Sequence, residues 1–277
     1  MKDKDSKDMN YWHEPFLYAL KLELYDYKDI LTFESEHKLS EEALRIDILV
    51  IKKNKDKSIK KNIGASFKEH NIFEFKSETD GLYVDDYNKV LGYTYLYIAF
   101  NKVKLEDVTI NFVTGKKPRA LFEYLRLLNL EIIEKEKGIY EIIGGQFPVK
   151  IIITKKLSIK ENTFLNSLRS NLETIELEQT LKKYSEYEEF KNKNVFLSRL
   201  ITANSKTFKE VMKTMPEAVL LDLEEALSGT ILEERWTKKG KAEGKAEGKA
   251  EGISYLAKLI REGHSLNEAV EIAMKMK

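Results

Sequence analysis

Two apolar segments of the chain carry charged side chains at positions where a buried strand would hold apolar ones. The first, residues 44–52, reads LRIDILVIK and is rich in β-branched and other aliphatic residues. Such a run predicts a strand that is buried on both faces of a sheet, yet Asp47 lies in its middle. An ionised carboxylate in that position is costly unless an ion pair or a bound cation compensates it. We therefore expect the fold to supply a compensating group for Asp47.

The second segment, residues 71–77, reads NIFEFKS. Because successive side chains of a strand point to opposite faces, Glu74 and Lys76 share one face and the two phenylalanines share the other. A glutamate and a lysine thus lie together on one face of an otherwise apolar strand. Two consecutive predicted strands carry first an Asp and then a Glu-x-Lys.

The three residues Asp47, Glu74 and Lys76 form a triplet that is suited to metal-assisted chemistry on a phosphate. Two carboxylates brought close together repel each other, and the pKa of one of them should rise. A hard divalent cation such as Mg²⁺ or Mn²⁺ removes that conflict, because it prefers oxygen ligands. The cation can acidify a bound water, and the lysine can orient that water or stabilise a developing anion. The alternative is structural, with Asp47 and Glu74 in buried salt bridges to Lys76 or Arg45.

The periodicity of the chain up to about residue 155 predicts alternating helices and strands. The order is helix, three strands, helix and strand, which indicates an α/β core with a mixed sheet. The predicted helices span residues 11–27, 85–100 and 117–128, and the predicted strands span residues 30–36, 44–52, 71–77, 108–113, 131–135, 139–143 and 149–154.

The rest of the chain predicts a mostly helical C-terminal extension. Residues 161–227 have helical spacing with breaks near Asn204 and Pro216, and the motif KAEG then occurs three times in residues 241–252. We therefore expect a domain at 1–155, a helical extension at 156–227, a tether or marginal helix at 228–252 and a terminal helix pair at 253–277. The helical region could also mediate homo-oligomerisation.

Composition narrows the class of protein. The chain has no cysteine, which excludes disulfides and thiolate chemistry, and no apolar run long enough to span a bilayer. We expect a cytoplasmic protein without a membrane partner. Its net charge is only +1, so binding to DNA would depend on local patches. Residues 52–68 hold seven lysines, which are either solvated or in contact with phosphates.

Longer stretches of the sequence resemble a known family. The segments HEPFLYALKLEL, LSEEALRIDILVIK, HNIFEFKS, DDYNKVLGYTYLY and GIYEIIGG, followed by the late EG repeats, together resemble the Rpn-like PD-(D/E)XK nuclease family, which is described as transposase-like. The resemblance extends over nearly the whole chain. In one departure, Ile46 stands where the superfamily motif has its proline.

The resemblance implies a restriction-endonuclease-like αβββαβ core that acts on DNA. It implies that Asp47, Glu74 and the backbone carbonyl of Phe75 hold the metal and that Lys76 is catalytic. Glu14, on the first predicted helix, matches a glutamate that often joins such sites.

Other residues near the triplet remain open to two interpretations. Glu34 and Glu36 on the first predicted strand are rivals for the role of third carboxylate. Lys89 and Tyr93 recur with Tyr97 at four-residue spacing on the predicted helix that follows the Glu-x-Lys strand. They either pack that helix onto the sheet, with the lysine reaching to solvent, or lie beside the scissile phosphate of bound DNA.

The function expected from these features is that of an Mg²⁺-dependent DNA endonuclease, linked to a mobile element or to recombination. The alternative is a DNA- or protein-binding module on the same fold whose catalytic site has decayed. A third interpretation is an assembly protein built on the KAEG segment and the helices beside it.

Overall fold

The computed structural model describes residues 12–38, 45–54, 56–187, 195–216 and 219, and all of them belong to one compact unit. The KAEG segment expected at 228–252 and the helix pair expected at 253–277 lie outside the described residues. Within the described ranges, no helix is both long enough and apolar enough to cross a membrane.

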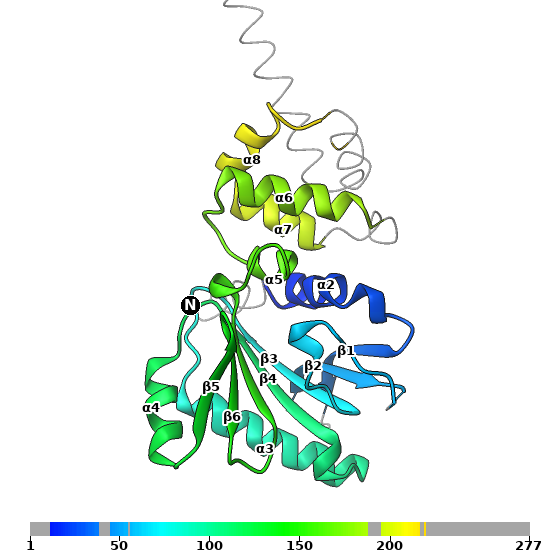
Figure 1. The fold of residues 1–277 in the computed structure, drawn as a ribbon, viewed down its shortest axis with the longest axis vertical. Helices are drawn as coiled ribbons and strands as arrows, with labels where there is room; N and C mark the ends of the chain where they lie inside the picture. The colour runs from blue at the N-terminus through cyan, green and yellow to red at the C-terminus, as the bar shows by residue number, and fades with distance from the viewer. Residues whose placement is uncertain (1–11, 39–44, 55, 188–194, 217–218, 220–277) are drawn as a thin grey trace, which may run out of the picture. The chain divides into compact units, whose positions relative to one another are not determined.

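A seven-stranded mixed sheet forms the centre of the molecule, with the strand order β1-β2-β3-β4-β7-β6-β5 (Figure 1). The neighbours β3, β4 and β7 run parallel, and every other neighbouring pair is antiparallel. This confirms the predicted α/β class and the mixed sheet. The strands are β1 Leu31–Lys38, β2 Arg45–Lys52, β3 His70–Lys76, β4 Val108–Thr114, β5 Glu131–Glu136, β6 Ile139–Ile143 and β7 Val149–Ile153.

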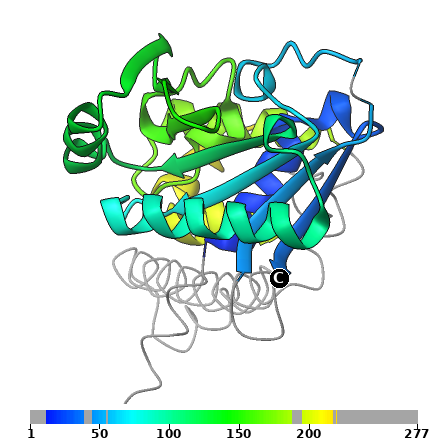
Figure 2. The same ribbon diagram turned by 90° about the horizontal axis from the view of Figure 1, so that it is seen from below.

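Two helices cover one face of the sheet. They are α3, Val84–Asn101, and α4, Arg119–Leu127, and Figure 2 shows α3 lying across the strands. Their apolar side chains share one buried cluster with Ile72, Ile110 and Phe112. Because strand side chains alternate, Glu74 and Lys76 point to the same face as Ile72 and therefore toward α3.

The helix α2, His13–Glu23, packs on the opposite face. The ring of Phe16 stacks on that of Phe75 with centroids 4.5 Å apart and lies 6.3 Å from that of Phe73. The first helix was predicted to run as far as Tyr27. Instead it ends at Glu23, because Leu24 leaves the helical conformation with φ −106° and ψ 18°, and residues Tyr25–Tyr27 form a separate 3₁₀ turn.

The helical region after the sheet packs onto α2 through α5, Thr163–Asn166, and α7, Val195–Ala203. The remaining helices are α6, Thr174–Ser185, and α8, Ser205–Val211. The predicted break near Asn204 is confirmed, since that residue separates α7 from α8. Its side chain is buried and accepts a hydrogen bond from the N–H of Leu172. The order α2, β1, β2, β3, α3, β4 also agrees with the predicted order of elements.

Candidate active site

The predicted triplet lies where β2 and β3 part. The last paired residues of these strands are Ile48 and Phe73, so Asp47 and Glu74 come one step beyond the end of the ladder. There the backbone N–H of Phe75 donates to Asp47 Oδ2 at 2.9 Å. The Asp47 carboxylate thus takes the place of the backbone carbonyl that would accept this hydrogen bond if β2 and β3 stayed paired. In a strand the N–H and C=O of one residue lie on the same edge. The carbonyl of Phe75 is therefore on the Asp47 side as well.

Glu74 and Lys76 form a network of ion pairs with α3. Lys76 Nζ lies 3.1 Å from Glu74 Oε1 and 2.9 Å from Asp86 Oδ1. Lys89 Nζ lies 3.6 Å from the same oxygen of Glu74. The carboxylate of Glu74 is buried and thus has two cations beside it, whereas Asp47 has neither of them within ion-pair distance.

Asp47 is the poorly compensated carboxylate of the group. Burial and the neighbouring charge of Glu74 raise its pKa from the usual 3.8 to about 6, although His13, the Phe75 N–H and Lys76 act in the opposite direction. For Lys76, burial lowers the pKa, but the carboxylates of Glu74 and Asp86 outweigh burial and hold it above its ordinary value. Lys76 therefore keeps its proton, whereas Asp47 can lose its proton only against the repulsion of the Glu74 carboxylate.

The residue of α2 that contacts Asp47 is His13. Its Nδ1 lies 3.5 Å from Asp47 Oδ2, and its ring meets the edge of the Phe75 ring at a centroid distance of 6.0 Å. Glu14, which the family resemblance selected, is exposed, and the group that its charge influences is the hydroxyl of Tyr18. Helical periodicity places His13 and Glu14 on adjacent positions, and it does not decide which of them faces the sheet.

Lys89 lies near Glu74 and Tyr93, and its contact with a DNA phosphate stays a prediction. It pairs with Glu74 and its ammonium lies 5.8 Å from the centre of the Tyr93 ring, while Tyr93 packs against the core beneath α3. Of the rival carboxylates, Glu34 pairs across the sheet with Leu49 and acts electrostatically on Tyr97, farther along β2 and α3 from the triplet. The side chain of Glu36 lies outside the described residues.

A pocket of about 390 Å³ opens beside Lys76 at the end of β3. It is bordered by α2, by the end of β3, by the loop that follows β3 and by the start of α3. Its lining residues are His13, Phe75, Lys76, Thr79, Asp80, Gly81, Tyr83 and Asp86. A small ligand could thus reach the triplet from this side.

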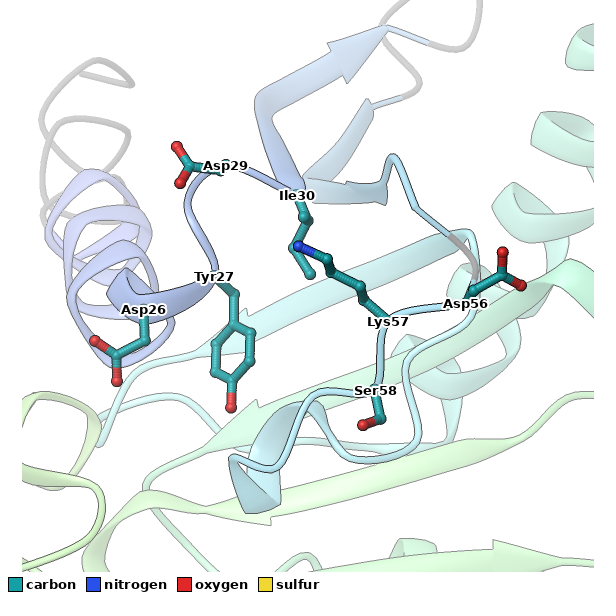
Figure 3. A pocket seen from close by; sticks show the side chains of 7 residues that line it. All are labelled: Asp26, Tyr27, Asp29, Ile30, Asp56, Lys57 and Ser58. Carbon is teal, nitrogen blue, oxygen red and sulfur yellow. The ribbon is translucent and has the colours of Figure 1, made fainter.

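A second pocket, of about 480 Å³, lies at the opposite end of the same strands (Figure 3). Asp26, Asp29 and Asp56 line it together with Lys57, and Figure 3 shows the three carboxylates pointing apart. The lysine-rich residues 52–68 connect the end of β2 to the start of β3, so this connection begins and ends one strand length, about 20 Å, from Lys76. Within it, Lys57 lines the second pocket and Lys61 pairs with Glu23, at the end of α2 away from His13. That stretch is not beside the triplet.

Among the residues that the structure describes, no three His, Cys, Asp or Glu side chains are grouped closely enough to hold a metal on their own. A metal at the triplet would therefore need backbone and water oxygens in addition to the two carboxylates.

Comparison with known proteins identifies no relative. No family model matches the sequence, and neither a curated protein nor a solved structure is similar enough to count as a match.

Proposed function

We propose that the protein is a DNA endonuclease of the PD-(D/E)XK type that depends on Mg²⁺ or Mn²⁺. The observation that carries this proposal is the pair of carboxylates at the end of the β2–β3 ladder. Asp47 lies beside Glu74 with a pKa raised to about 6, and a lysine stands next to them. The order α2, β1, β2, β3, α3, β4 supports a restriction-endonuclease-like core.

The oxygen atoms at the triplet fit a hard divalent cation. The side chains of Asp47 and Glu74 and the carbonyl of Phe75 would hold it, and Mg²⁺ usually binds through one or two carboxylates with water in the remaining positions. A cation there would remove the repulsion that raises the pKa of Asp47. When bound, it would supply an acidified water and neutralise charge on a phosphate.

The side chains around the triplet would then divide the remaining tasks. Lys76 keeps its proton, so it would act as a hydrogen-bond donor and cation toward the attacking water or the phosphate, and not as a base. Asp86 would hold Lys76 in place through the 2.9 Å ion pair. Lys89, whose side chain is 44% exposed, would offer a positive charge to the DNA backbone.

A DNA- or protein-binding module with a decayed site is the second candidate. It is favoured by the closed network in which Glu74 already pairs with Lys76 and Lys89 and in which Lys76 also pairs with Asp86. In that case the network would be purely structural. Divalent metal would then leave the melting temperature unchanged, because only a ligand that binds the folded state stabilises it.

The Rpn-like relationship, with its link to recombination or to a mobile element, is part of the same proposal. Assembly through the C-terminal helices, whose sequence lies largely outside the described residues, is also a proposal. Light scattering of a chain that lacks residues 239–277 tests it, since an unchanged mass would exclude a role for this segment in oligomers.

The nuclease proposal is tested by the nicking of supercoiled plasmid in Mg²⁺ and in Mn²⁺. Wild type is compared with Asp47→Asn and Lys76→Met, and with the matched controls Asp29→Asn and Lys57→Met from the pocket at the far end of the strands. We expect metal-dependent nicking that both site variants lose and both controls keep. Absence of nicking by the folded wild-type protein in either metal would contradict the nuclease proposal and favour the binding module.

A further inference from the structure

We propose that the pocket beside Lys76 receives one unpaired base of a DNA strand, next to the phosphate to be cleaved, and that Tyr83 stacks on this base. The inference rests on the proposed function in that it takes DNA as the ligand. It adds a preference for single-stranded or frayed DNA over intact duplex.

The size of the pocket suits a single small group. Its volume of about 390 Å³ lies at the small end of the range of about 300–1,000 Å³ that is typical of small-molecule sites. Lys76 is part of its wall, so a ligand inside the pocket is adjacent to the triplet. A base in a duplex would have to leave its stack and its partner to enter, at an energetic cost that an unpaired base does not have.

Tyr83 provides a fixed aromatic surface at this pocket. Its backbone N–H donates to Asp86 Oδ2, and its carbonyl accepts from the N–H of Tyr87, so the backbone is tied to the start of α3. A Cβ placed on Gly81 would lie 2.4–2.7 Å from atoms of the Tyr83 ring, so the ring packs closely on that glycine. Tyr83 is nevertheless 62% exposed. Exposed rings held in this way are used to stack the bases of single strands.

The loop between β3 and α3 is also held in place. Ser77 donates to Asp80 Oδ2 at 2.7 Å, and the Asp80 N–H donates to the Ser77 carbonyl. Glu78 accepts from the N–H of Ser170 at 2.8 Å in the segment that leads to α6. The wall of the pocket is thus formed before any ligand binds, which favours affinity because less conformational freedom is lost.

The charges of the lining favour a base over a phosphate. Asp80 and Asp86 contribute two carboxylates, and Lys76 is already paired with Asp86 and Glu74. Such a lining repels phosphate but can accept hydrogen bonds from the amino groups on base edges. The phosphate is expected outside the pocket, on the side of Lys76 and Lys89.

The test is binding of the full chain to matched DNA oligonucleotides, single-stranded and blunt duplex, without divalent metal. One base is replaced by 2-aminopurine, whose emission falls when it stacks. The variants are Tyr83→Ala, Tyr83→Phe and the control Tyr95→Ala, an exposed tyrosine farther along α3 that does not line the pocket. We expect tighter binding of the single strand. Tyr83→Ala should weaken it about 10-fold, whereas Tyr83→Phe and Tyr95→Ala should keep it.

Gly81→Ala is a second variant, because its methyl group would displace the ring of Tyr83 without removing it. It should weaken single-strand binding and leave the circular dichroism spectrum unchanged. Equal affinity for both DNAs, or binding that is insensitive to Tyr83→Ala, would overturn the inference. Metal-dependent cleavage together with either result would leave the nuclease proposal standing. Binding that depends on Tyr83, without cleavage in any metal, would instead contradict the nuclease proposal and support the binding of a base in the pocket.

Discussion

Two carboxylates of this molecule, Glu23 and Asp47, are largely removed from solvent, but the fold compensates their negative charges to different extents. The side chain of Glu23, at the end of α2, is 1% exposed. It lies 2.9 Å from Lys61 Nζ and accepts hydrogen bonds from the N–H groups of Phe164 and Leu165 at 2.6 and 3.1 Å. Both of its oxygens are compensated, and the carboxylate joins α2 to the helical region.

Asp47 is less buried, with 21% of its side chain exposed, yet it is less well compensated. It accepts a hydrogen bond from the backbone N–H of Phe75 and lies 3.5 Å from His13 Nδ1, and burial together with the charge of Glu74 raises its pKa. The extent of burial therefore does not explain the difference between Glu23 and Asp47. The two carboxylates differ in how much positive charge and how many donors the fold supplies, and the proposed cation would make up the shortfall at Asp47.

The largest expected difference between the two carboxylates is in catalysis. Asp47→Asn should reduce metal-dependent plasmid nicking about 100-fold or more, because it removes a metal ligand and the charge that attracts the cation. Glu23→Gln should leave the rate of nicking within about threefold of wild type at a temperature where both are folded. Similar losses in the two variants would mean that Asp47 acts only through the fold.

The next largest effect is on stability, and here we expect the large loss at Glu23 and not at Asp47. Glu23→Ala should lower the free energy of unfolding by about 3–5 kcal/mol, because it leaves Lys61 and two buried N–H groups without their partner. Urea denaturation at about pH 7 measures it. A loss below about 1 kcal/mol would show that water replaces the carboxylate and that Glu23 is not the structural counterpart of Asp47.

A third effect concerns the pH dependence of Asp47. Its pKa is raised to about 6, so the folded protein binds this proton more tightly than the unfolded chain does. The contribution of Asp47 to the free energy of unfolding therefore falls as the pH rises from about 4 to about 6, by at most about 3 kcal/mol, and stays lower above that range.

An asparagine side chain carries no charge, and Asp47→Asn should therefore stabilise the metal-free protein by about 1–3 kcal/mol at about pH 8 and have little effect at about pH 4. Urea denaturation at the two pH values measures the difference. Equal stability of Asp47→Asn and wild type at the higher pH would show that the charge of Asp47 is already compensated in the metal-free protein.

The smallest effect is expected at Lys89, on the rim of the site. Its ion pair with Glu74 is partly exposed, so Lys89→Ala should change the free energy of unfolding by less than about 1 kcal/mol. If Lys89 contacts DNA, the same variant should weaken binding of DNA and reduce its dependence on salt. Unchanged DNA binding would leave Lys89 with a packing role only.

Much of the fold follows from local patterns in the sequence. The β-branched run around Asp47, the alternation around Glu74 and the glycine turn at Gly144, whose φ is +96°, each determine their own element. The order of the strands does not follow, because the placement of β7 between β4 and β6 depends on long-range packing.

The site was predictable only in part, for the same reason. Asp47, Glu74 and Lys76 are visible because charge is rare in apolar strands. His13 and Asp86 are not, since His13 depends on the rotation of α2 about its axis, and Asp86 looks like an ordinary acidic residue at a helix start. Asp86 does bind the N–H of Tyr83 there, but its other oxygen holds Lys76.

The proposed function depends above all on whether Asp47 and Glu74 can share a divalent cation. Binding of Mn²⁺, followed by electron paramagnetic resonance of the free ion, decides this in wild type, Asp47→Asn and Glu23→Gln. We expect one Mn²⁺ per chain in wild type and in Glu23→Gln, displaced by Mg²⁺, and none in Asp47→Asn. Absence of binding to wild type, or equal binding to Asp47→Asn, would show that the two carboxylates do not form a metal site.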